Sequence, residues 1–346
     1  MMKIYQILIN LLIISSIISI SNVAQAARIL ELTGEVTIKR KNTQNFLPAD
    51  KGMIIKYGDL IKLSETAEVK VICADADKTI KSLSPGDIAG LANFCPGNRN
   101  TNPRIGSIFP ELLDGSYQYQ TEIISDKPIL IWPSIKDADS YQVKITVGEE
   151  VIWEKLVNDT NIIYDGSAFL PKVPYVLSVT AGNDNSPFYQ LRLNRVLSVI
   201  QDTIQKEIDE IKQEDVNEEA KALMLVDVYV NQNRKLFLDA ADTLETIVKT
   251  ESKTPIIHRL LGDMYLYLGK TEAAKTQYLQ SLELAKFGKN IEEMAASQTG
   301  LASVAVINQQ LETAKNLLSQ AQENYKQSGR VSDAELVQGY LSLMDN

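Results

Sequence analysis

The hydrophobic and polar positions of the chain follow different periods in successive stretches. From Ala27 to about Gly97, apolar and polar residues alternate, most clearly in residues 35–40 and 67–72. This period of two is typical of strands that bury one face. Glycines stand between the alternating runs at turn positions. The pattern predicts a small all-β domain over residues 27–97.

A second alternating stretch covers residues 121–190. Its clearest runs are residues 141–145 and 175–179, and they predict a second β module. Residues 98–120, between the two stretches, hold several Pro, Gly and Asn residues with little periodicity. That composition predicts a linker.

From Leu191 to the end of the chain, apolar positions recur at helical spacing, which predicts an all-α domain over residues 191–346. Residues 192–212 are expected to form an amphipathic first helix. Residues 254–285 are similar to a stretch 40 residues further on, and a weaker copy begins at Ala222. One pair of helices cannot bury its own apolar face, so such repeats must stack. We expect a curved stack of helix pairs, ended by a capping helix, with a hollow side free to hold another polypeptide.

The first β stretch is similar to a known family. Residues 33–41 (TGEVTIKRK) and 49–87 resemble the β domain of the FecR family, in which a Gly-x-Val strand precedes a Gly-Asp-x-Ile strand. The FecR regulator joins this domain to an anti-sigma segment and a transmembrane helix, and neither is recognised in this sequence. The resemblance therefore implies the fold of that domain, and a signalling role is not carried over.

The other two stretches also resemble known families. Residues 127–183 resemble a reduced fibronectin type III or related immunoglobulin-like sandwich, because Trp132 and the Ala-x-x-Tyr-x-Val pattern at residues 138–143 stand at that family's positions. The repeats over residues 219–327 resemble tetratricopeptide repeats. Together the resemblances imply a multidomain α and β protein with a FecR-like β domain, an immunoglobulin-like β-sandwich and a tetratricopeptide-repeat solenoid. The combination resembles exported bacterial envelope proteins, including cyanobacterial ones.

The N-terminus predicts export. Lys3 precedes an apolar stretch from Ile4 to Ile20, and residues 24–26 (AQA) match a small-x-small cleavage pattern. We expect residues 1–26 to be a cleaved signal peptide and the mature protein to be periplasmic, secreted or in the cell envelope, without an integral membrane segment. The alternative is an uncleaved anchor, although the stretch is short for ~30 Å of hydrocarbon and carries serines.

Export determines how the two cysteines are interpreted. In an oxidising compartment, Cys73 and Cys95 are expected to form a disulfide, worth on the order of 3 kcal/mol for a loop of this length. The alternative is two buried free thiols. A catalytic cysteine is not expected, because the single histidine, His258, lies far along the chain in a helical repeat.

Charge and motifs exclude several functions. The chain has 35 Lys and Arg against 44 Asp and Glu, a net charge of −9, so no nucleic-acid partner is expected. One histidine and two cysteines exclude most metal and nucleophile arrangements. The sequence has no phosphate-binding glycine loop, no His-Glu-x-x-His and no Gly-x-Ser-x-Gly. We expect no catalytic residue, no metal site and no cofactor.

The remaining candidate surface is the hollow face of the repeat array, which the first helix of each pair forms. It mixes polar residues with isolated apolar and aromatic ones, and such a face can hold an extended peptide or a helix. The candidate partner-binding residues are Asp227, Asn231, Arg259, Asp263, Tyr267, Thr299, Ser303 and Ile307, with Val230 and Leu266 beside them.

Three functional hypotheses follow. The first is a non-catalytic exported adaptor or scaffold that binds a protein or peptide in this groove. The second is a carbohydrate or cell-wall binding protein that uses the β modules, with the helices as a spacer or dimerisation element; exposed Trp132 and Trp153 side chains would favour it. The third is a hydrolase, which requires a pocket that brings together Asp and Glu side chains of raised pKa.

Overall fold

A computed structural model describes residues 26–345 apart from short internal segments. Residues 1–25 of the expected signal peptide lie outside the described residues, as does most of the expected linker. The internal segments outside the description are 42, 57, 74–78, 84, 87, 92–94, 96–110, 113–116, 183–185 and 231–233.

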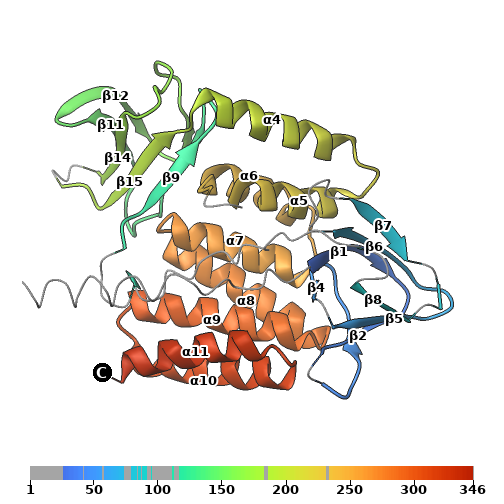
Figure 1. The fold of residues 1–346 in the computed structure, drawn as a ribbon. Coiled ribbons are helices and arrows are strands. Elements are labelled where there is room, and N and C mark those ends of the chain that lie inside the picture. Colours follow the sequence, from blue (N-terminus) through green and yellow to red (C-terminus); the bar gives the residue numbers. More distant parts are fainter. Residues whose placement is uncertain are drawn as a thin grey trace, which may run out of the picture.

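The expected division into β and α parts is confirmed. A β-rich N-terminal part holds four sheets, and the described C-terminal part is all-α with eight helices. Figure 1 shows the helices stacked between two β regions. We call these the N-terminal β region (residues 26–95) and the middle β region (residues 120–195).

Two four-stranded antiparallel sheets form the N-terminal β region. Their inward faces carry alternating apolar side chains such as Ile29, Ile38, Ile61 and Val71, which form one buried cluster. The sheet orders are β4-β1-β6-β7 and β3-β2-β5-β8. The strands are β1 (Ala26–Thr33), β2 (Val36–Lys39), β3 (Leu47–Pro48), β4 (Ile54–Lys56), β5 (Leu60–Leu63), β6 (Glu68–Cys73), β7 (Ile80–Leu83) and β8 (Ile88–Gly90).

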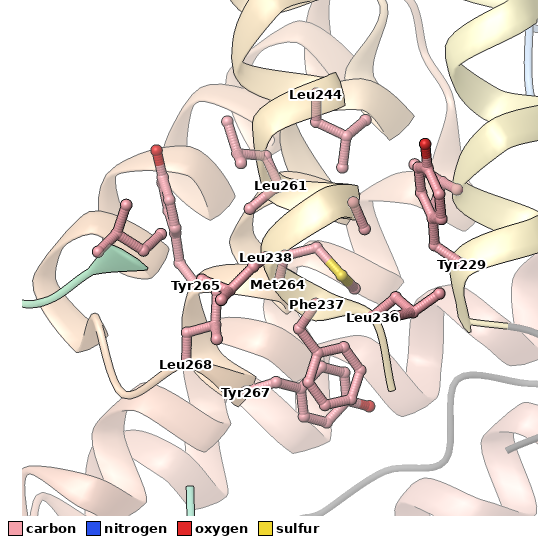
Figure 2. Close-up of a cluster of buried hydrophobic side chains, with 14 of the residues drawn as sticks. Tyr229, Leu236, Phe237, Leu238, Leu244, Leu261, Met264, Tyr265, Tyr267 and Leu268 are labelled. Atoms are coloured by element: carbon pink, nitrogen blue, oxygen red, sulfur yellow. The ribbon is translucent and has the colours of Figure 1, made fainter. Parts of the chain in front are cut away.

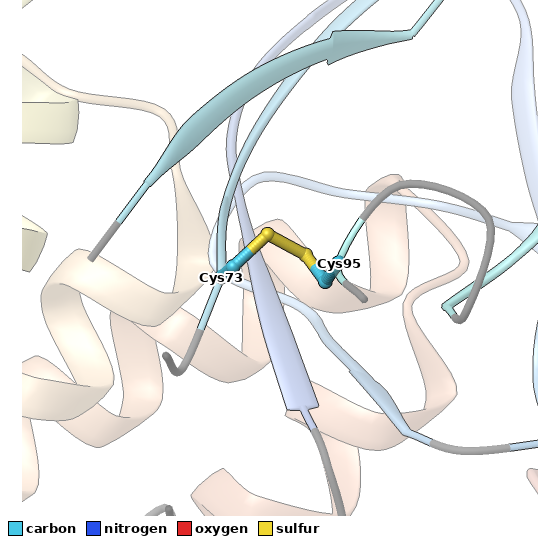
Figure 3. The surroundings of a disulfide bond; sticks show 2 residues. All are labelled: Cys73 and Cys95. Carbon is cyan, nitrogen blue, oxygen red and sulfur yellow. A yellow bond between two sulfur atoms is a disulfide. The ribbon is translucent and has the colours of Figure 1, made fainter. Parts of the chain in front are cut away.

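A disulfide joins Cys73 at the end of β6 to Cys95, with their Cα atoms 5.6 Å apart (Figure 3). Both cysteines are buried in the apolar cluster of the N-terminal β region. The pairing anticipated from the sequence is therefore present in the structure. It ties the last described residue of this region to the strand that pairs with β1 and β7.

The middle β region is a five-stranded sheet of order β12-β11-β14-β15-β9 with a two-stranded sheet, β10-β13. An aromatic core fills it, with Trp132 and Tyr164 fully buried and the rings of Tyr164 and Phe169 4.4 Å apart. The strands are β9 (Gln120–Ile123), β10 (Ile129–Ile131), β11 (Tyr141–Val147), β12 (Glu150–Val157), β13 (Asn161–Ile163), β14 (Pro174–Ala181) and β15 (Tyr189–Arg195).

The predicted start of the helical part, at Leu191 with a first helix from Arg192, is wrong. Residues up to Arg195 belong to β15, which pairs antiparallel with β14 and parallel with β9. Leu191 and Leu193 are buried while Arg192 is exposed, so this segment alternates as a strand does. Sequence reasoning extended the helical spacing of Val196 and Ile204 backwards into the strand.

In the helical region each helix contacts the next one along the chain, and α7 also contacts α9. None of the described helices combines the length and apolar character needed to cross a membrane. The helices are α4 (Ser198–Gln213), α5 (Glu218–Val230), α6 (Phe237–Val248), α7 (Pro255–Tyr267), α8 (Thr271–Phe287), α9 (Ile291–Ile307), α10 (Leu311–Gln327) and α11 (Val331–Met344).

The middle β region is joined to the helices through a shared apolar core. One cluster runs from Trp132 and Leu193 to Tyr267 and Leu301. Thr121 Oγ1 donates to the Lys235 carbonyl at 2.8 Å, and the Tyr189 hydroxyl donates to the Leu268 carbonyl at 2.7 Å. These contacts lie at the end of α7 and before the start of α6. Figure 2 shows part of this cluster, in which the Phe237 and Tyr267 rings stack 4.5 Å apart.

The N-terminal β region contacts the opposite ends of the helices, mainly through polar groups. Lys51 Nζ lies 3.0 Å from Glu219 Oε2 at the start of α5, and Asn290 Nδ2 donates to Asp50 Oδ2 at 3.1 Å before α9. Gly52 packs against Ile256 at the start of α7. This region thus covers the N-terminal ends of α5, α7 and α9. Most of its buried apolar residues form a cluster separate from that of the helices.

Two glycines allow α8 to pack between its neighbours. The Tyr278 ring of α8 is buried against Gly262 of α7 and Gly300 of α9, and a Cβ at either position would meet ring atoms, at 2.7 Å for Gly262. Because the ring is held from both sides, it cannot move away. We expect Gly300→Ala to lower the free energy of unfolding by about 1–3 kcal/mol.

The matched control is Gly339→Ala in α11, where nothing lies within 4 Å of the added Cβ. Alanine there should raise the free energy of unfolding by about 0.5–1 kcal/mol, because glycine is unfavourable in a helix interior. Urea denaturation of both variants measures the two values. Equal effects would mean that the Tyr278 packing is not tight.

Candidate functional site

The candidate site is a cavity of about 590 Å³ between the helical region and the N-terminal β region. The helical side is formed mainly by α5, α7 and α9, which were predicted to line the hollow face, and by the capping helix α11. Tyr278 of α8 and Tyr325 of α10 also line it. Arg28 of β1 with Met53 and Ile54 at the start of β4 form the opposite wall. A volume of this size lies in the range of ordinary ligand clefts.

Small side chains on one face of α9 leave this space open. Ala296, Thr299, Gly300 and Ser303 line the cavity, and their spacing places them on a single helix face. The two hydroxyls are satisfied inside the helix, because Thr299 Oγ1 donates to the Ala295 carbonyl at 3.0 Å and Ser303 Oγ to the Thr299 carbonyl at 3.3 Å. The floor of the cavity is therefore small and only weakly polar.

A charged network centred on Arg259 forms the middle of the cavity. Arg259 Nε donates to Glu293 Oε2 and Nη1 to Asp263 Oδ2, both at 2.7 Å. The Tyr278 hydroxyl donates to Asp263 Oδ1 at 2.8 Å. Burial by itself lowers the pKa of Arg259, but the charges of Glu293 and Asp263 outweigh burial and raise that pKa above its ordinary value. The charged Arg259 side chain of α7 therefore links this helix to α9 through Glu293.

A second network connects α11 and α9 to the N-terminal β region. Arg330 Nε donates to Asp333 Oδ2 at 2.7 Å, and its Nη1 lies 3.7 Å from Glu292 Oε2. Arg40 Nε donates to Glu292 Oε1 at 2.6 Å, while Arg40 Nη1 donates to Asp59 Oδ2 at 2.7 Å. The Arg40 side chain is only 3% exposed. Buried ion pairs with several hydrogen bonds hold a defined geometry, so this network fixes one wall of the cavity.

A further ion pair, between Arg28 and Asp227, is bidentate. Arg28 donates from Nη2 to Asp227 Oδ1 at 2.8 Å and from Nε to Asp227 Oδ2 at 3.1 Å. The Asp227 side chain is 40% exposed, so this pair is accessible to solvent at the cavity rim. It joins β1 to the last turn of α5.

Part of the cavity lining is aromatic. Tyr267 and Tyr340 line it and are mostly buried. The Tyr117 hydroxyl donates to the Tyr267 carbonyl at 3.3 Å, which places the described end of the linker beside α7. Aromatic rings and arginines in a cleft are the residue types that anchor bound polypeptides.

The structure brings most of the predicted groove residues together. Ile307 instead packs against the large apolar core, and Asn231 lies outside the described residues. The predicted residues that line the cavity are Asp227, Arg259, Asp263, Tyr267, Thr299 and Ser303, with Val230 and Leu266 beside them.

One expectation about this face needs correction, because the hollow side is not freely open. The N-terminal β region stands against it and supplies Arg28, Met53 and Ile54. Sequence reasoning also missed Arg330 and Asp333 of the capping helix. Extending the helical periodicity to α11 indicates Arg330 and Asp333. Nothing local in the sequence indicates that the β region contributes to the cavity.

The two tryptophans do not form a binding platform. Trp132 is fully buried and Trp153 is 8% exposed. Trp153 Nε1 donates to Asp165 Oδ1 at 2.7 Å. The carbohydrate hypothesis therefore loses the observation that would have favoured it.

The condition set for a hydrolase is met only in part. The cavity does bring Asp and Glu side chains together, and burial raises the pKa of Asp263 although Arg259 and Tyr278 act in the opposite direction. Both oxygens of Asp263 are engaged, however, and Glu292 is held by Arg40 and Arg330. A general acid or base needs a lone pair or proton within reach of substrate, and these two carboxylates are committed to arginines.

Two further expectations concern groups other than the cavity residues: the role of His258 and the binding of a metal ion. The His258 ring is buried and lies 2.9 Å from Gln277 Oε1 of α8 and 3.0 Å from the carbonyl oxygen of Ser252, which precedes α7. In the described part of the chain, no group of three or more His, Cys, Asp and Glu side chains is arranged to hold a metal ion.

Comparisons with known proteins add no relative. A scan of the chain against models of protein families finds no match. A search of curated proteins likewise finds none. The functional argument therefore depends on the residues and geometry of the cavity itself.

Proposed function

We propose that this protein is a non-catalytic exported adaptor that binds a segment of a partner protein in the cavity between its helices and its N-terminal β region. In this proposal the helices are tetratricopeptide-type repeats, the N-terminal β region is FecR-like and the middle β region is immunoglobulin-like. The observation that carries the proposal is the convergence of six predicted groove residues on one cavity of about 590 Å³.

The construction of the cavity supports a binding role. Small side chains of α9 and the rings of Tyr267 and Tyr340 are part of its lining. Its walls are held by ion pairs between separate elements, such as Arg259 with Glu293 and Arg28 with Asp227. A preorganised cleft loses little conformational entropy on binding, which favours affinity from a few anchors.

The proposal is tested by filling the cavity. Thr299→Trp places a large ring over the α9 floor without removing any charge. We expect it to reduce capture of envelope proteins by the mature protein at least about tenfold, equivalent to ~1.4 kcal/mol. The matched control is Thr276→Trp on α8, an exposed threonine whose hydroxyl also bonds the carbonyl four residues earlier.

A photo-crosslinking amino acid at position 299 identifies what enters the cavity. Cross-linked peptides from a partner, mapped by mass spectrometry and lost when Ser303→Trp is added, would support the proposal. Glycans in place of polypeptides would favour the carbohydrate hypothesis. Undiminished capture by a folded Thr299→Trp variant would show that the partner binds elsewhere.

A further inference from the structure

The charges around the cavity do not balance. Its lining contains three arginines and five carboxylates, which leaves two negative charges in excess. Behind Glu292, the buried Arg40 and Asp59 add one charge of each sign and leave this excess unchanged. The lining residues concerned are Arg28, Arg259 and Arg330 against Asp227, Asp263, Glu292, Glu293 and Asp333.

Glu293 is a buried lining carboxylate with one oxygen that accepts no hydrogen bond from the described residues. Its Oε2 accepts from Arg259 Nε at 2.7 Å, but within the described ranges no hydrogen bond reaches its Oε1. By contrast, both oxygens of Asp227 accept from Arg28, and both of Asp263 are engaged. Glu293 therefore has an acceptor left for a group that enters the cavity.

The position of Glu293 in the helix suits an acidic side chain. Glu293 lies in the first turn of α9, near the positive end of the helix dipole, where acidic side chains are favourable. Burial raises the pKa of nearby Asp50, and the negative charge of Glu293 acts in the same direction.

The floor beside Glu293 suits a long aliphatic stem. Ala296 follows Glu293 by about one turn of α9 and lines the cavity, with Met53 and Ile54 on the opposite wall. Lysine and arginine side chains place their methylene groups against apolar surface while the charged end reaches a polar partner. The cavity offers both kinds of contact in adjacent positions.

We propose that the cavity selects a partner segment that carries a basic side chain, whose cationic group binds Glu293 while its stem lies along the small-residue face of α9. This inference rests on the proposed function, because it names the chemistry of the segment that the cavity binds. An acidic segment is disfavoured, because all three lining arginines are already paired with carboxylates and it would meet the excess of negative charge.

The test uses three fluorescently labelled peptides of one length. The probe alternates lysine and alanine, and the other two replace lysine with glutamine or with glutamate. With the full mature protein at low salt, we expect fluorescence polarisation to give a dissociation constant at least about tenfold lower for the lysine peptide than for the glutamine peptide. The glutamate peptide should bind most weakly. Glu293→Gln should reduce the lysine preference to about twofold or less.

The matched control is Glu283→Gln on α8, which removes the same charge at a side chain that is 70% exposed. It should leave the lysine preference unchanged. If Glu293→Gln proves unfolded, hydrogen exchange on the unmodified protein replaces it, and the lysine peptide should slow exchange of the amides in residues 296–303.

The outcomes separate this inference from the proposed function. Equal binding of all three peptides, abolished by Thr299→Trp, would leave the groove proposal intact and overturn the basic preference. Lysine-peptide binding that survives both Glu293→Gln and Thr299→Trp would mean attraction to the acidic surface at large, which also overturns it. Failure of every peptide, together with no polypeptide cross-linked at position 299, would overturn the proposed function itself.

Discussion

Replacing Arg40 with Met is expected to lower the free energy of unfolding by about 3–5 kcal/mol, because the change leaves two carboxylates without their buried partner. Arg40 donates to Asp59 within the N-terminal β region and to Glu292 at the start of α9. It also donates to the Ile54 carbonyl at 2.6 Å. One guanidinium thus links the fold of the β region to its attachment on the helices and to the cavity wall.

Urea denaturation measures this loss, and Arg192→Met is its control. Arg192 is an exposed arginine on β15, so its replacement should change stability by no more than about 0.5 kcal/mol. Arg40→Lys should be intermediate, since lysine keeps the charge but lacks the planar set of donors. If Arg40→Met were no more destabilising than Arg192→Met, the buried network would not hold the β region in place.

The second large effect is a pH dependence that arises from Asp239 in the first turn of α6. Burial raises the pKa of Asp239 from the ordinary 3.8 to about 7; Asp242 acts in the same direction and Arg195 opposes it. The folded protein therefore binds this proton more tightly than the unfolded chain does. The stability that protonated Asp239 contributes is fully present below about pH 4 and is lost as the pH rises to about 7. Above that pH the free energy of unfolding no longer changes because of this group.

Asp239→Asn should remove this dependence. At one pKa unit per ~1.4 kcal/mol, the penalty at neutral pH is about 4 kcal/mol, so the variant should be more stable than the wild type at pH 7.5 and similar to it at pH 4. Denaturation across this range measures the difference, and Asp202→Asn, an exposed aspartate in α4, gives the background. A difference independent of pH would show that Asp239 does not titrate in this range.

Local patterns in the sequence were sufficient for the secondary structure and for much of the cavity floor. Alternation predicts β6 and β11, because a strand with one buried face must alternate, and the repeat predicts α7 and α9, because stacked helices must bury one stripe each. The same spacing placed Arg259, Asp263 and Thr299 on one face. The boundary at Leu191 failed because short apolar runs satisfy both periods.

The remaining features of the cavity were determined by contacts between elements that are far apart in the sequence. Arg28 reaches Asp227 and Arg40 reaches Glu292 across separations of 199 and 252 residues, and no local pattern encodes which charges meet at such distances. The buried position of Trp153 likewise depends on packing within the middle β region. Sequence alone determined which faces are apolar and which residues can line a groove; tertiary structure decided that a β region closes one side of it, because only the docking of separate elements fixes which polar groups face each other.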